Sequence, residues 1–544
     1  MTPASTWQRL LPLRADSDPL LSAIEAELDS ERTATELIRH EAEGRYPASV
    51  VSRLREVGLA ELFSEDATVY QACALNALAA RRSGSLAIIL GVNTLALLPA
   101  HLAATGAQRE RIFSRVAGGA LSALLLTEWA HGSDLLSTRT RAERDGEAFV
   151  VTGEKNLING GHTADLLMTL VRTGAADSPG GSGLGSTGGF SVLLIERDDT
   201  VTALPRYRTL PGAAADISGV KLAGTRVPVT NLIGGQGEGF SIIQKTLTIS
   251  RGGIGSLAAG AANRAWDLAS GYADRRSLYG APIAMLGGIA EHLHKLEALD
   301  LAASALAVKT TAAMNALGQG AAYYTAAAKF ACCQLAEQAV DEGRRILSAR
   351  ALLDELPYAR LIRDVTLYSV FDGTRHLMLD QVQWRLKQMA AREPGGDPRP
   401  RWREIYDTPP VPLGQAVAKR GRPLLVWVHE HARAMGADDL AHVSEALSSL
   451  VRWAVERDCW DRDQALQFGA AEVGALLEAA LAAAELVTDR EKRDPAIGYV
   501  GAQAASMLRH LAARVGAGIG ELDAAERSLA RRCGPPTVPQ TEKS

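Results

Sequence analysis

The chain has 544 residues, too many for a single hydrophobic core, so we expect three or four units that share interfaces. Hydrophobic residues make up 47% of it and aromatic residues only 5%, which favours helices with small side chains. A formal net charge of -4 gives no general attraction to nucleic acid or to an anionic membrane. The five cysteines lack metal-ligand spacing, so we expect no metal site, no disulfides and a reducing compartment.

The ends of the chain and its most apolar stretch bear on localisation. The first twenty residues lack the basic start and long apolar run of a secretory signal. The longest apolar helical stretch, 472–487, is interrupted by Glu478 and Glu485 and is too short to span a bilayer. We therefore expect a cytoplasmic protein that engages neither membrane nor nucleic acid.

The hydrophobic period changes along the chain and divides it into units. Residues 1–120 carry apolar positions at helical spacing and predict an N-terminal helical domain. Over 121–238 the spacing becomes that of short strands bounded by Gly, Asp or Pro, which predicts a central β domain. Helical spacing returns over 239–392 and predicts a bundle of long helices. A linker rich in Pro, Gly and Arg, 393–412, precedes a C-terminal helical extension, 413–544.

The most informative stretch is LLLTEWAHGSDL at 124–135, where an apolar strand runs into a loop of small polar residues. Thr127 and Ser133 supply hydroxyls there, and Gly132 lets backbone N–H groups approach closely. Such a loop is typical of a cradle for a flat, anionic cofactor. For this stretch alone, an ordinary strand end remains the alternative.

Five motifs in order resemble the acyl-CoA dehydrogenase family over about residues 20–390. They are TEWAHGSD at 127–134 (family TEPGAGSD), GEKNLINGG at 153–161 (GxKxWITNG), VPVTNLIGGQGEGF at 227–240 (the strand exit), DRRSLYGAPI at 274–283 (RxxFG) and RDVTLYSVFDGT at 363–374 (RDxxxxxIYEGT). The resemblance implies a mainly α fold with a central β domain. It has an N-terminal helical domain, a small β-barrel or sandwich, a C-terminal helical bundle and, here, an extra helical module.

The resemblance implies α,β-dehydrogenation of an acyl thioester, tethered to coenzyme A or to an acyl carrier protein. In that reaction a carboxylate takes the α-proton and N5 of FAD accepts the β-hydride. The resemblance places the base at Asp372, where the family most often has Glu, although relatives that oxidise nitroalkanes use Asp. Some members carry the base at the position of Ser250, where Ser cannot serve. The alternative is that Asp372 only caps a helix beginning at Gly373.

The resemblance also implies a set of cofactor contacts. Thr127 bonds the pyrimidine ring, Ser133 approaches a phosphate and Thr374 approaches the cofactor from the base loop. The full set implied for FAD is Leu126, Thr127, Gly132, Ser133, Leu157, Asn159, Arg276, Arg345 and Thr374.

Two arginines carry further implications. Arg276 resembles the family arginine that reaches the pyrophosphate of a neighbouring subunit, which implies a homodimer or homotetramer. A solvated helix charge is the alternative for Arg276. Arg251 matches an arginine that lines the thioester site and binds substrate, with an interhelical salt bridge as its alternative.

Three positions depart from the family pattern. Leu157 replaces the aromatic residue that shields the flavin, which reduces stacking area and can admit solvent or oxygen. Asn159 replaces the Thr near N5, and its amide can still donate to N5 or O4. Arg345 begins the stretch 345–349 that stands in place of the family's QxxGG, and its guanidinium can contact phosphate.

The C-terminal extension has no motif and slightly more acidic than basic residues, which is not typical of a duplex-binding surface. We expect a helical pad that closes a dimer or covers the active site. The whole chain is interpreted as an FAD-dependent acyl thioester dehydrogenase in specialised metabolism that passes electrons to a separate acceptor flavoprotein. The alternatives are a flavin oxidase or monooxygenase of the nitroalkane-oxidase type and a non-catalytic flavin-containing binding protein.

Overall fold

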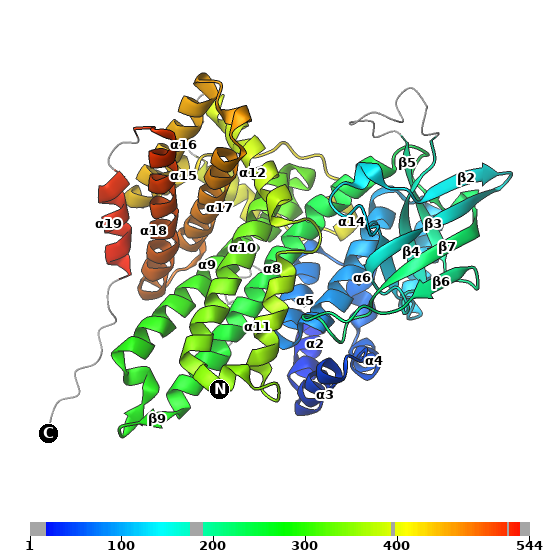
Figure 1. Cartoon of the computed structure of the whole chain (residues 1–544), viewed down its shortest axis with the longest axis horizontal. Coiled ribbons are helices and arrows are strands. Elements are labelled where there is room, and N and C mark those ends of the chain that lie inside the picture. The colour runs from blue at the N-terminus through cyan, green and yellow to red at the C-terminus, as the bar shows by residue number, and fades with distance from the viewer. Residues whose placement is uncertain (1–17, 175–188, 393–397, 519–521, 534–544) are drawn as a thin grey trace.

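A computed structural model describes residues 18–174, 189–392, 398–518 and 522–533. A bundle of long helices forms the middle of the molecule, with the β domain on one side and the C-terminal helices on the other (Figure 1). The N-terminal helices fill the space between the bundle and the β domain. The mainly helical fold with a central β domain is therefore confirmed.

The N-terminal helices are held together by apolar faces at helical spacing, and all of them except α4 begin at a side-chain cap. At the start of α5, Thr68 Oγ1 accepts from the Gln71 backbone N–H at 3.2 Å, and the Gln71 side chain accepts from Thr68 N–H at 2.9 Å. The helices of this part are α2 (Pro19–Asp29), α3 (Glu31–Glu43), α4 (Ala48–Glu56), α5 (Val69–Arg82), α6 (Gly84–Ala103) and α7 (Gly106–Ala117).

The β domain is an eight-stranded sheet in the order β6-β7-β3-β2-β4-β5-β8, with β1 paired to β4. It encloses an apolar core of its own, which includes Phe149, Val151 and Leu222. The β3–β7 pair is antiparallel, and an irregularity between Asn156 and Ile158 leaves Leu157 as an extra residue. The strands are β1 (Ser122–Leu125), β2 (Arg141–Asp145), β3 (Ala148–Asn159), β4 (Leu166–Arg172), β5 (Phe190–Glu196), β6 (Val201–Leu204), β7 (Ile217–Pro228) and β8 (Leu232–Ile233).

The bundle is built from α8, α9 and α10, which are rich in Ala and Gly and pack closely together. A small hairpin of β9 and β10 follows α8, and the loop 369–374 joins α11 to α12. The elements are α8 (Gly239–Arg275), β9 (Ser277–Leu278), β10 (Ala281–Pro282), α9 (Gly287–Leu317), α10 (Ala322–Leu347), α11 (Pro357–Tyr368) and α12 (Arg375–Ala390).

The stretch predicted as a linker contains a helix and is anchored to the bundle. Residues 393–397 of this stretch lie outside the part of the chain that the structure describes. Its described part contains helix α13 (Arg399–Tyr406). Asn315 of α9 donates to the carbonyl oxygens of Thr408 and Pro409 and accepts from Val411 N–H. Leu413 N–H then donates to the Ala67 carbonyl at 2.7 Å. The end of this stretch therefore packs between the N-terminal helices and the bundle.

The C-terminal extension packs on the bundle through a buried ionic cluster. Lys309 of α9 lies 3.3 Å from Glu478 and 2.9 Å from Glu485, and His431 lies 3.2 Å from Glu485. Such a cluster is costly to break, because it would leave buried charges unpaired. The helices here are α13 (Arg399–Tyr406), α14 (Leu413–Ala418), α15 (Val428–Ala434), α16 (Asp438–Glu456), α17 (Gln464–Leu486), α18 (Arg490–Val515) and α19 (Leu522–Arg532).

Two of the described helices, α6 and α17, are long and apolar enough to cross a membrane by length and composition. In each, 72% of the apolar window is buried inside the structure. The core helices of a folded domain have this same character, so these two helices are weak support for a membrane span.

Candidate active site

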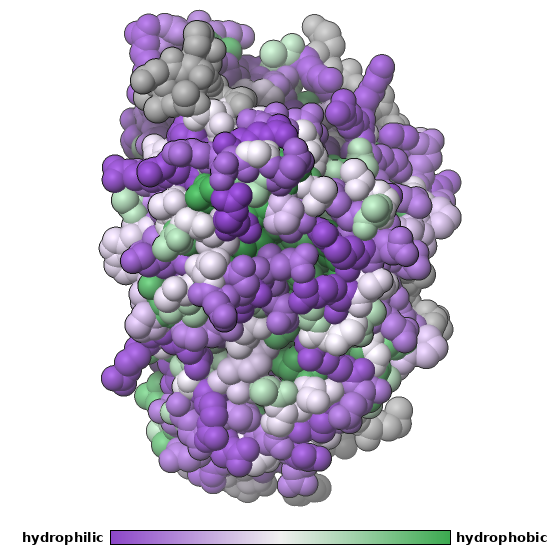
Figure 2. Space-filling view, turned by 90° about the vertical axis from the view of Figure 1, so that its right-hand side faces the viewer, coloured by the Kyte–Doolittle hydropathy of each residue, from purple (hydrophilic) through white to green (hydrophobic). Residues whose placement is uncertain are grey.

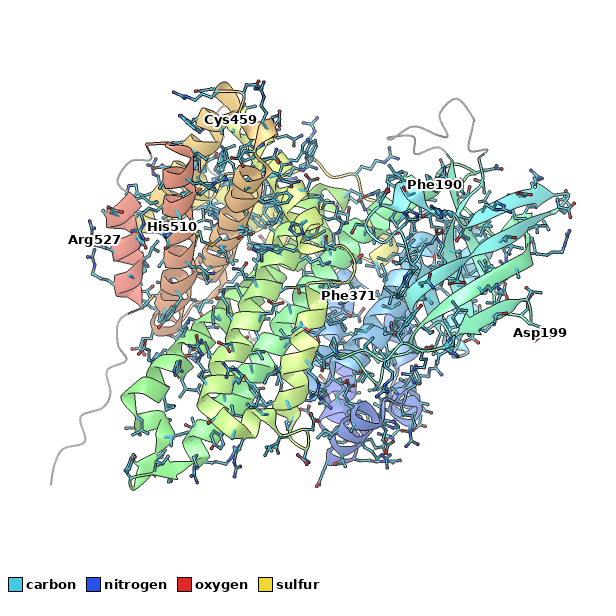
Figure 3. All side chains as sticks on the ribbon, in the orientation of Figure 1. Phe190, Asp199, Phe371, Cys459, His510 and Arg527 are labelled. Atoms are coloured by element: carbon cyan, nitrogen blue, oxygen red, sulfur yellow. The ribbon has the colours of Figure 1, made fainter. Side chains whose placement is uncertain are left out.

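The loop between α11 and α12 carries Asp372 and lies at the junction of the bundle and the N-terminal helices, where Phe371 is labelled (Figure 3). Asp372 has φ +57 and is followed by Gly373 at φ +103, so the chain turns sharply here. Helix α12 starts at Arg375 with Thr374 as its N-cap residue, and the cap makes no side-chain hydrogen bond. Asp372 therefore does not cap this helix, and the prediction that it is only a helix cap is wrong.

The Asp372 carboxylate points toward α8. Ser250 Oγ donates a hydrogen bond to Asp372 Oδ2 at 2.5 Å, while Oδ1 is buried without a hydrogen-bond partner among the described residues. Burial raises the pKa of the carboxyl above its ordinary value, and Lys329, Arg251 and the Ser250 bond oppose that rise. The side chains at the two positions where the family carries its base, Asp372 and Ser250, are thus in direct contact.

Lys329 of α10 fixes the backbone of the base loop. Its ammonium group donates to the carbonyl oxygens of Phe371 and Gly373, one on each side of Asp372. The side chain is almost fully buried, and burial lowers the pKa of the amine to about 8, with Asp372 acting in the opposite direction. The sequence prediction missed this residue. A lone Lys inside an apolar helix, as in AAAKFACC, could have indicated it, because a buried ammonium group requires hydrogen-bond partners from neighbouring elements.

Arg251 is also buried beside the base loop. Its Nη1 donates to Gln381 Oε1 of α12 at 2.9 Å, and its charge opposes the rise of the Asp372 pKa. Its Nε has no hydrogen-bond partner among the described residues. No interhelical salt bridge of Arg251 is present among the described residues, because its partner on α12 is the neutral amide of Gln381. Its predicted place next to the thioester site is compatible with its position and remains a prediction.

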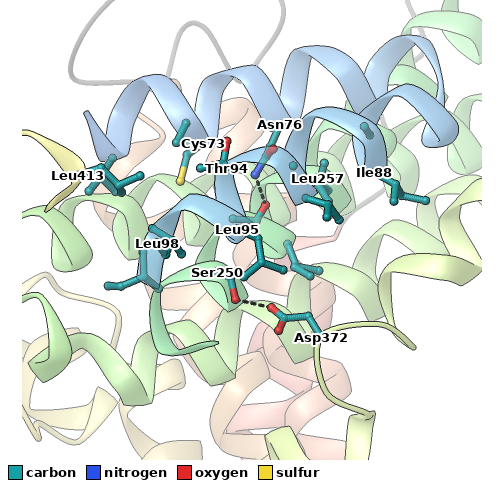
Figure 4. Close-up of a pocket in the computed structure, with 18 of the residues that line it drawn as sticks. Cys73, Asn76, Ile88, Thr94, Leu95, Leu98, Ser250, Leu257, Asp372 and Leu413 are labelled. Atoms are coloured by element: carbon teal, nitrogen blue, oxygen red, sulfur yellow. Dashed lines mark hydrogen bonds between the residues drawn. The ribbon is translucent and has the colours of Figure 1, made fainter. Parts of the chain in front are cut away.

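Asp372 lies at one end of a pocket between α5, α6 and α8 (Figure 4). The pocket contains about 550 Å³ of space, part of it open to solvent. Its lining is mostly apolar, with Ile88, Leu95, Leu98, Ile254, Leu257 and Met314 among the residues. The arrangement sets a single carboxylate at the end of a channel that suits a hydrocarbon chain.

The predicted flavin loop lies against the C-terminal part of β3, an interior strand, at the edge of the sheet where that strand ends. Asn156 N–H donates to the Thr127 carbonyl at 2.9 Å, and Trp129 N–H donates to Asn156 Oδ1 at 2.9 Å. Beneath this loop, Lys155 Nζ lies 2.8 Å from the Leu126 carbonyl and 3.1 Å from Glu128 Oε1. This buried ion pair holds the loop in place, and the sequence prediction missed it, although both charges stand inside the two quoted motifs.

The residues at this edge fit a flat, partly polar ring. Leu157 has φ +55 in the β-bulge, and 52% of its surface is exposed. Two residues along, Asn159 Oδ1 is buried without a hydrogen-bond partner among the described residues. Gly132 and Ser133 are exposed on the adjoining loop. An exposed apolar side chain beside an unpaired amide matches the mixed surface of an isoalloxazine, so the predicted residues fit FAD.

Figure 2 shows the molecule from the side of the β domain. This face is mostly hydrophilic, with hydrophobic residues in small, separate patches.

The structure does not bring every predicted cofactor residue together. Arg276 is exposed at the end of α8 beside the β9–β10 hairpin, which lies at the far end of the bundle from the β domain (Figure 1). Arg345 pairs with Asp341 on its own helix at 2.8 Å. Within one chain, neither reaches the edge formed by Thr127 and Leu157. The role predicted for Arg276 toward a neighbouring subunit remains a prediction.

Comparison with known proteins agrees with this geometry. The model of the acyl-CoA dehydrogenase middle domain matches residues 123–223, and that of the acyl-CoA dehydrogenase C-terminal domain matches 237–387. Cyclohex-1-ene-1-carbonyl-CoA dehydrogenase of Geobacter metallireducens is 28% identical over 300 residues, which covers 55% of this chain and 77% of that protein. Acryloyl-CoA reductase (NADH) of Anaerotignum propionicum is 27% identical over 363 residues, covering 65% and 89%.

A solved structure extends the likeness to the C-terminal helices. Acyl-CoA dehydrogenase from Bacillus anthracis, complexed with FAD, superposes with a TM-score of 0.76 at 19% identity, covering 98% of this chain and 95% of that one. Fold and site together define a flavin oxidoreductase of the class that acts on CH–CH groups. The chain belongs to the acyl-CoA dehydrogenase family, as the motifs predicted, and this family depends on FAD.

Proposed function

We propose that this protein catalyses α,β-dehydrogenation of an acyl thioester with Asp372 as the base. The observation that carries the proposal is the buried, unpaired Oδ1 of Asp372 at the end of the apolar pocket. A base that must remove a weakly acidic C–H proton benefits from a raised pKa, and burial raises that of Asp372. The bound FAD would supply the acceptor for the β-hydride.

The residues around the base have distinct tasks in this proposal. Lys329 holds the backbone on both sides of Asp372 and so fixes the point from which the carboxylate would reach the α-carbon. Ser250 orients the other oxygen and leaves Oδ1 free for the proton. The flavin would be held at the sheet edge by Leu126, Thr127, Gly132, Ser133, Leu157 and Asn159. Thr374 would approach it from the base loop.

The carrier and the electron acceptor belong to the same proposal. Relatives named for acyl-CoA substrates support coenzyme A as the tether, with an acyl carrier protein as the alternative. Electrons would leave to a separate flavoprotein, and a role in specialised metabolism is inferred from the altered base and shield. The exposed Leu157 keeps the oxidase alternative open, because a small shield leaves the ring accessible to oxygen.

Anaerobic addition of acyl-CoA and acyl-carrier thioesters to the FAD-loaded protein tests the proposal. We expect at least one thioester to bleach the flavin absorbance and to yield the 2,3-unsaturated product. Rapid reoxidation in air with an oxygenated product would instead identify an oxidase or monooxygenase. If no thioester reduces the flavin, dehydrogenation is wrong.

A further inference from the structure

One polar side chain interrupts the apolar wall of the pocket. Asn76 of α5 is only 7% exposed and lines the pocket, where Figure 4 shows it above Leu95 and Ser250. Its Nδ2 donates to the Gly253 carbonyl of α8 at 3.4 Å, which fixes the orientation of the amide. Its Oδ1 has no hydrogen-bond partner among the described residues. The wall therefore contains an oriented but unused acceptor.

Two glycines make the space that this amide occupies. A Cβ at Gly253 of α8 would lie 2.9 Å from Asn76 Nδ2, and a Cβ at Gly91 of α6 would lie 3.1 Å from Asn76 Oδ1. Both glycines are inside helices, where glycine costs about 1 kcal/mol relative to alanine. Neither can gain a side chain without displacing the amide. The site is thus shaped by all three helices that form the pocket.

A second polar group lies on the facing helix. Thr94 of α6 also lines the pocket, and its Oγ1 is buried without a hydrogen-bond partner among the described residues. Leaving a buried polar atom unpaired is unfavourable, so two such atoms in one mostly apolar pocket indicate a ligand with a polar group. Asp372 is the one charged side chain among the described lining residues, so that group is uncharged.

We propose that Asn76 is a specificity-determining residue that accepts a hydrogen bond from a hydroxyl, or an equivalent uncharged donor, on the acyl chain of the substrate. This inference rests on the proposed thioester function. Gly253 lies three residues after Ser250 on α8, so the amide is slightly less than one helical turn, about 4.5 Å, further along the pocket than the base. The donor therefore belongs roughly three to five carbons beyond the α-carbon.

The test compares octanoyl-CoA with hydroxyoctanoyl-CoA isomers in which the hydroxyl is moved carbon by carbon along the chain. Affinity is measured by calorimetry with the matching thioether analogues, in which a methylene replaces the thioester carbonyl. We expect one isomer to bind the FAD-loaded protein about tenfold or more tighter than the unsubstituted chain. Asn76→Leu should abolish that preference, because Leu has a similar size and no acceptor.

Thr94→Val provides a second variant that keeps side-chain shape, and it should reduce the same preference. Leu257→Met is the matched control, since it alters apolar packing and should change the affinity for both kinds of chain by the same factor. The inference is overturned if no isomer binds more than about threefold tighter than octanoyl. It is also overturned if Asn76→Leu keeps the preference, whatever Thr94→Val does.

Flavin bleaching by the thioesters separates this inference from the proposed function. A hydroxyl preference in binding without bleaching by any thioester would support the pocket assignment and refute dehydrogenation. Bleaching by all chains with equal affinities would support dehydrogenation and refute the pocket assignment. Absence of binding by every analogue would refute the pocket assignment, whereas dehydrogenation is judged by bleaching alone.

Discussion

Replacement of Asp372 by Asn is the most direct test of the proposed base. Asn is nearly the same size, and its amide oxygen can still accept the bond that Ser250 Oγ makes at 2.5 Å. The variant loses the ability to take a proton at the buried Oδ1 position, together with the negative charge that faces Lys329 and Arg251. The loop should keep its shape, because Lys329 binds backbone carbonyl oxygens and not the carboxylate.

The size of the effect follows from the role. A positioned general base contributes about 10²- to 10⁴-fold to the rate, equivalent to roughly 3 to 5 kcal/mol of activation free energy. No other carboxylate lines the described pocket, so no neighbour can replace it. We expect the rate of anaerobic flavin reduction at saturating thioester to fall by that factor, with the flavin colour retained.

Stability should move in the opposite direction. Because burial raises the pKa of Asp372, the ionised carboxylate costs folding free energy, a cost that develops as pH rises from about 3.8 through the raised pKa. Asn removes the cost, so at pH 7 the variant should melt no lower than the wild type. Near pH 3, where the carboxyl is protonated in both states, the difference should vanish.

Stopped-flow absorbance of the flavin measures the rate, and thermal melting measures stability. Asp199→Asn, on the exposed turn between β5 and β6, is the matched control and should leave both quantities unchanged (Figure 3). A reduction rate for Asp372→Asn within about threefold of the wild type would refute the assignment of the base.

Three further predictions follow from the contacts of the site and of the extension. A carboxylate placed at position 250, as Ser250→Glu in an Asp372→Ala background, should raise the flavin-reduction rate at least about tenfold over Asp372→Ala alone, because the side chains of residues 250 and 372 meet at 2.5 Å. No increase would contradict the inference that the two positions can hold the base at the same point. The wild-type flavin-reduction rate should decline above about pH 8, because Lys329 then loses its proton. Lys329→Met should remove that decline and, because the charge that lowers the pKa of Asp372 is lost, move the acid limb of the pH profile to higher pH; an unchanged profile would refute this role of Lys329. Lys309→Met should lower the free energy of unfolding by about 3 to 5 kcal/mol, because it leaves two buried glutamates without their partner. Lys492→Met, in a partly exposed pair with Glu297, should lower it by less than about 1 kcal/mol, and equal losses in denaturant titrations would refute the buried-pair argument.

Much of the fold could be predicted because hydrophobic period is a local property. The change from helical to strand spacing after residue 120, and back after 238, is visible along the chain and corresponds to the ends of α7 and β8. The position of α13 inside the expected linker was not visible, because its Pro and Arg content is that of a loop. There, packing of Trp402 and Ile405 overrides local propensity.

Candidate site residues were predictable where they stand in contiguous motifs. Thr127, Leu157 and Asp372 belong to such motifs, and the structure gives each a position consistent with its predicted role. Lys329 and Asn76 do not belong to a motif, since the roles inferred for them depend on groups that other elements of the fold place beside them. Whether Asp372 capped a helix or faced a pocket was likewise undecidable from the sequence, because a cap and a base call for the same residue type.

The sequence by itself determined the family, the order of the domains and the chemistry of the short motifs, since each is written in consecutive residues. Only the tertiary structure decided that Ser250 contacts Asp372, that Lys329 binds the loop of Asp372 and that Asn76 leaves an unpaired acceptor in the apolar pocket. These contacts join residues from 42 to 122 positions apart in the chain, or depend on an atom that finds no partner. Helix packing fixes such distances, and no local pattern encodes them.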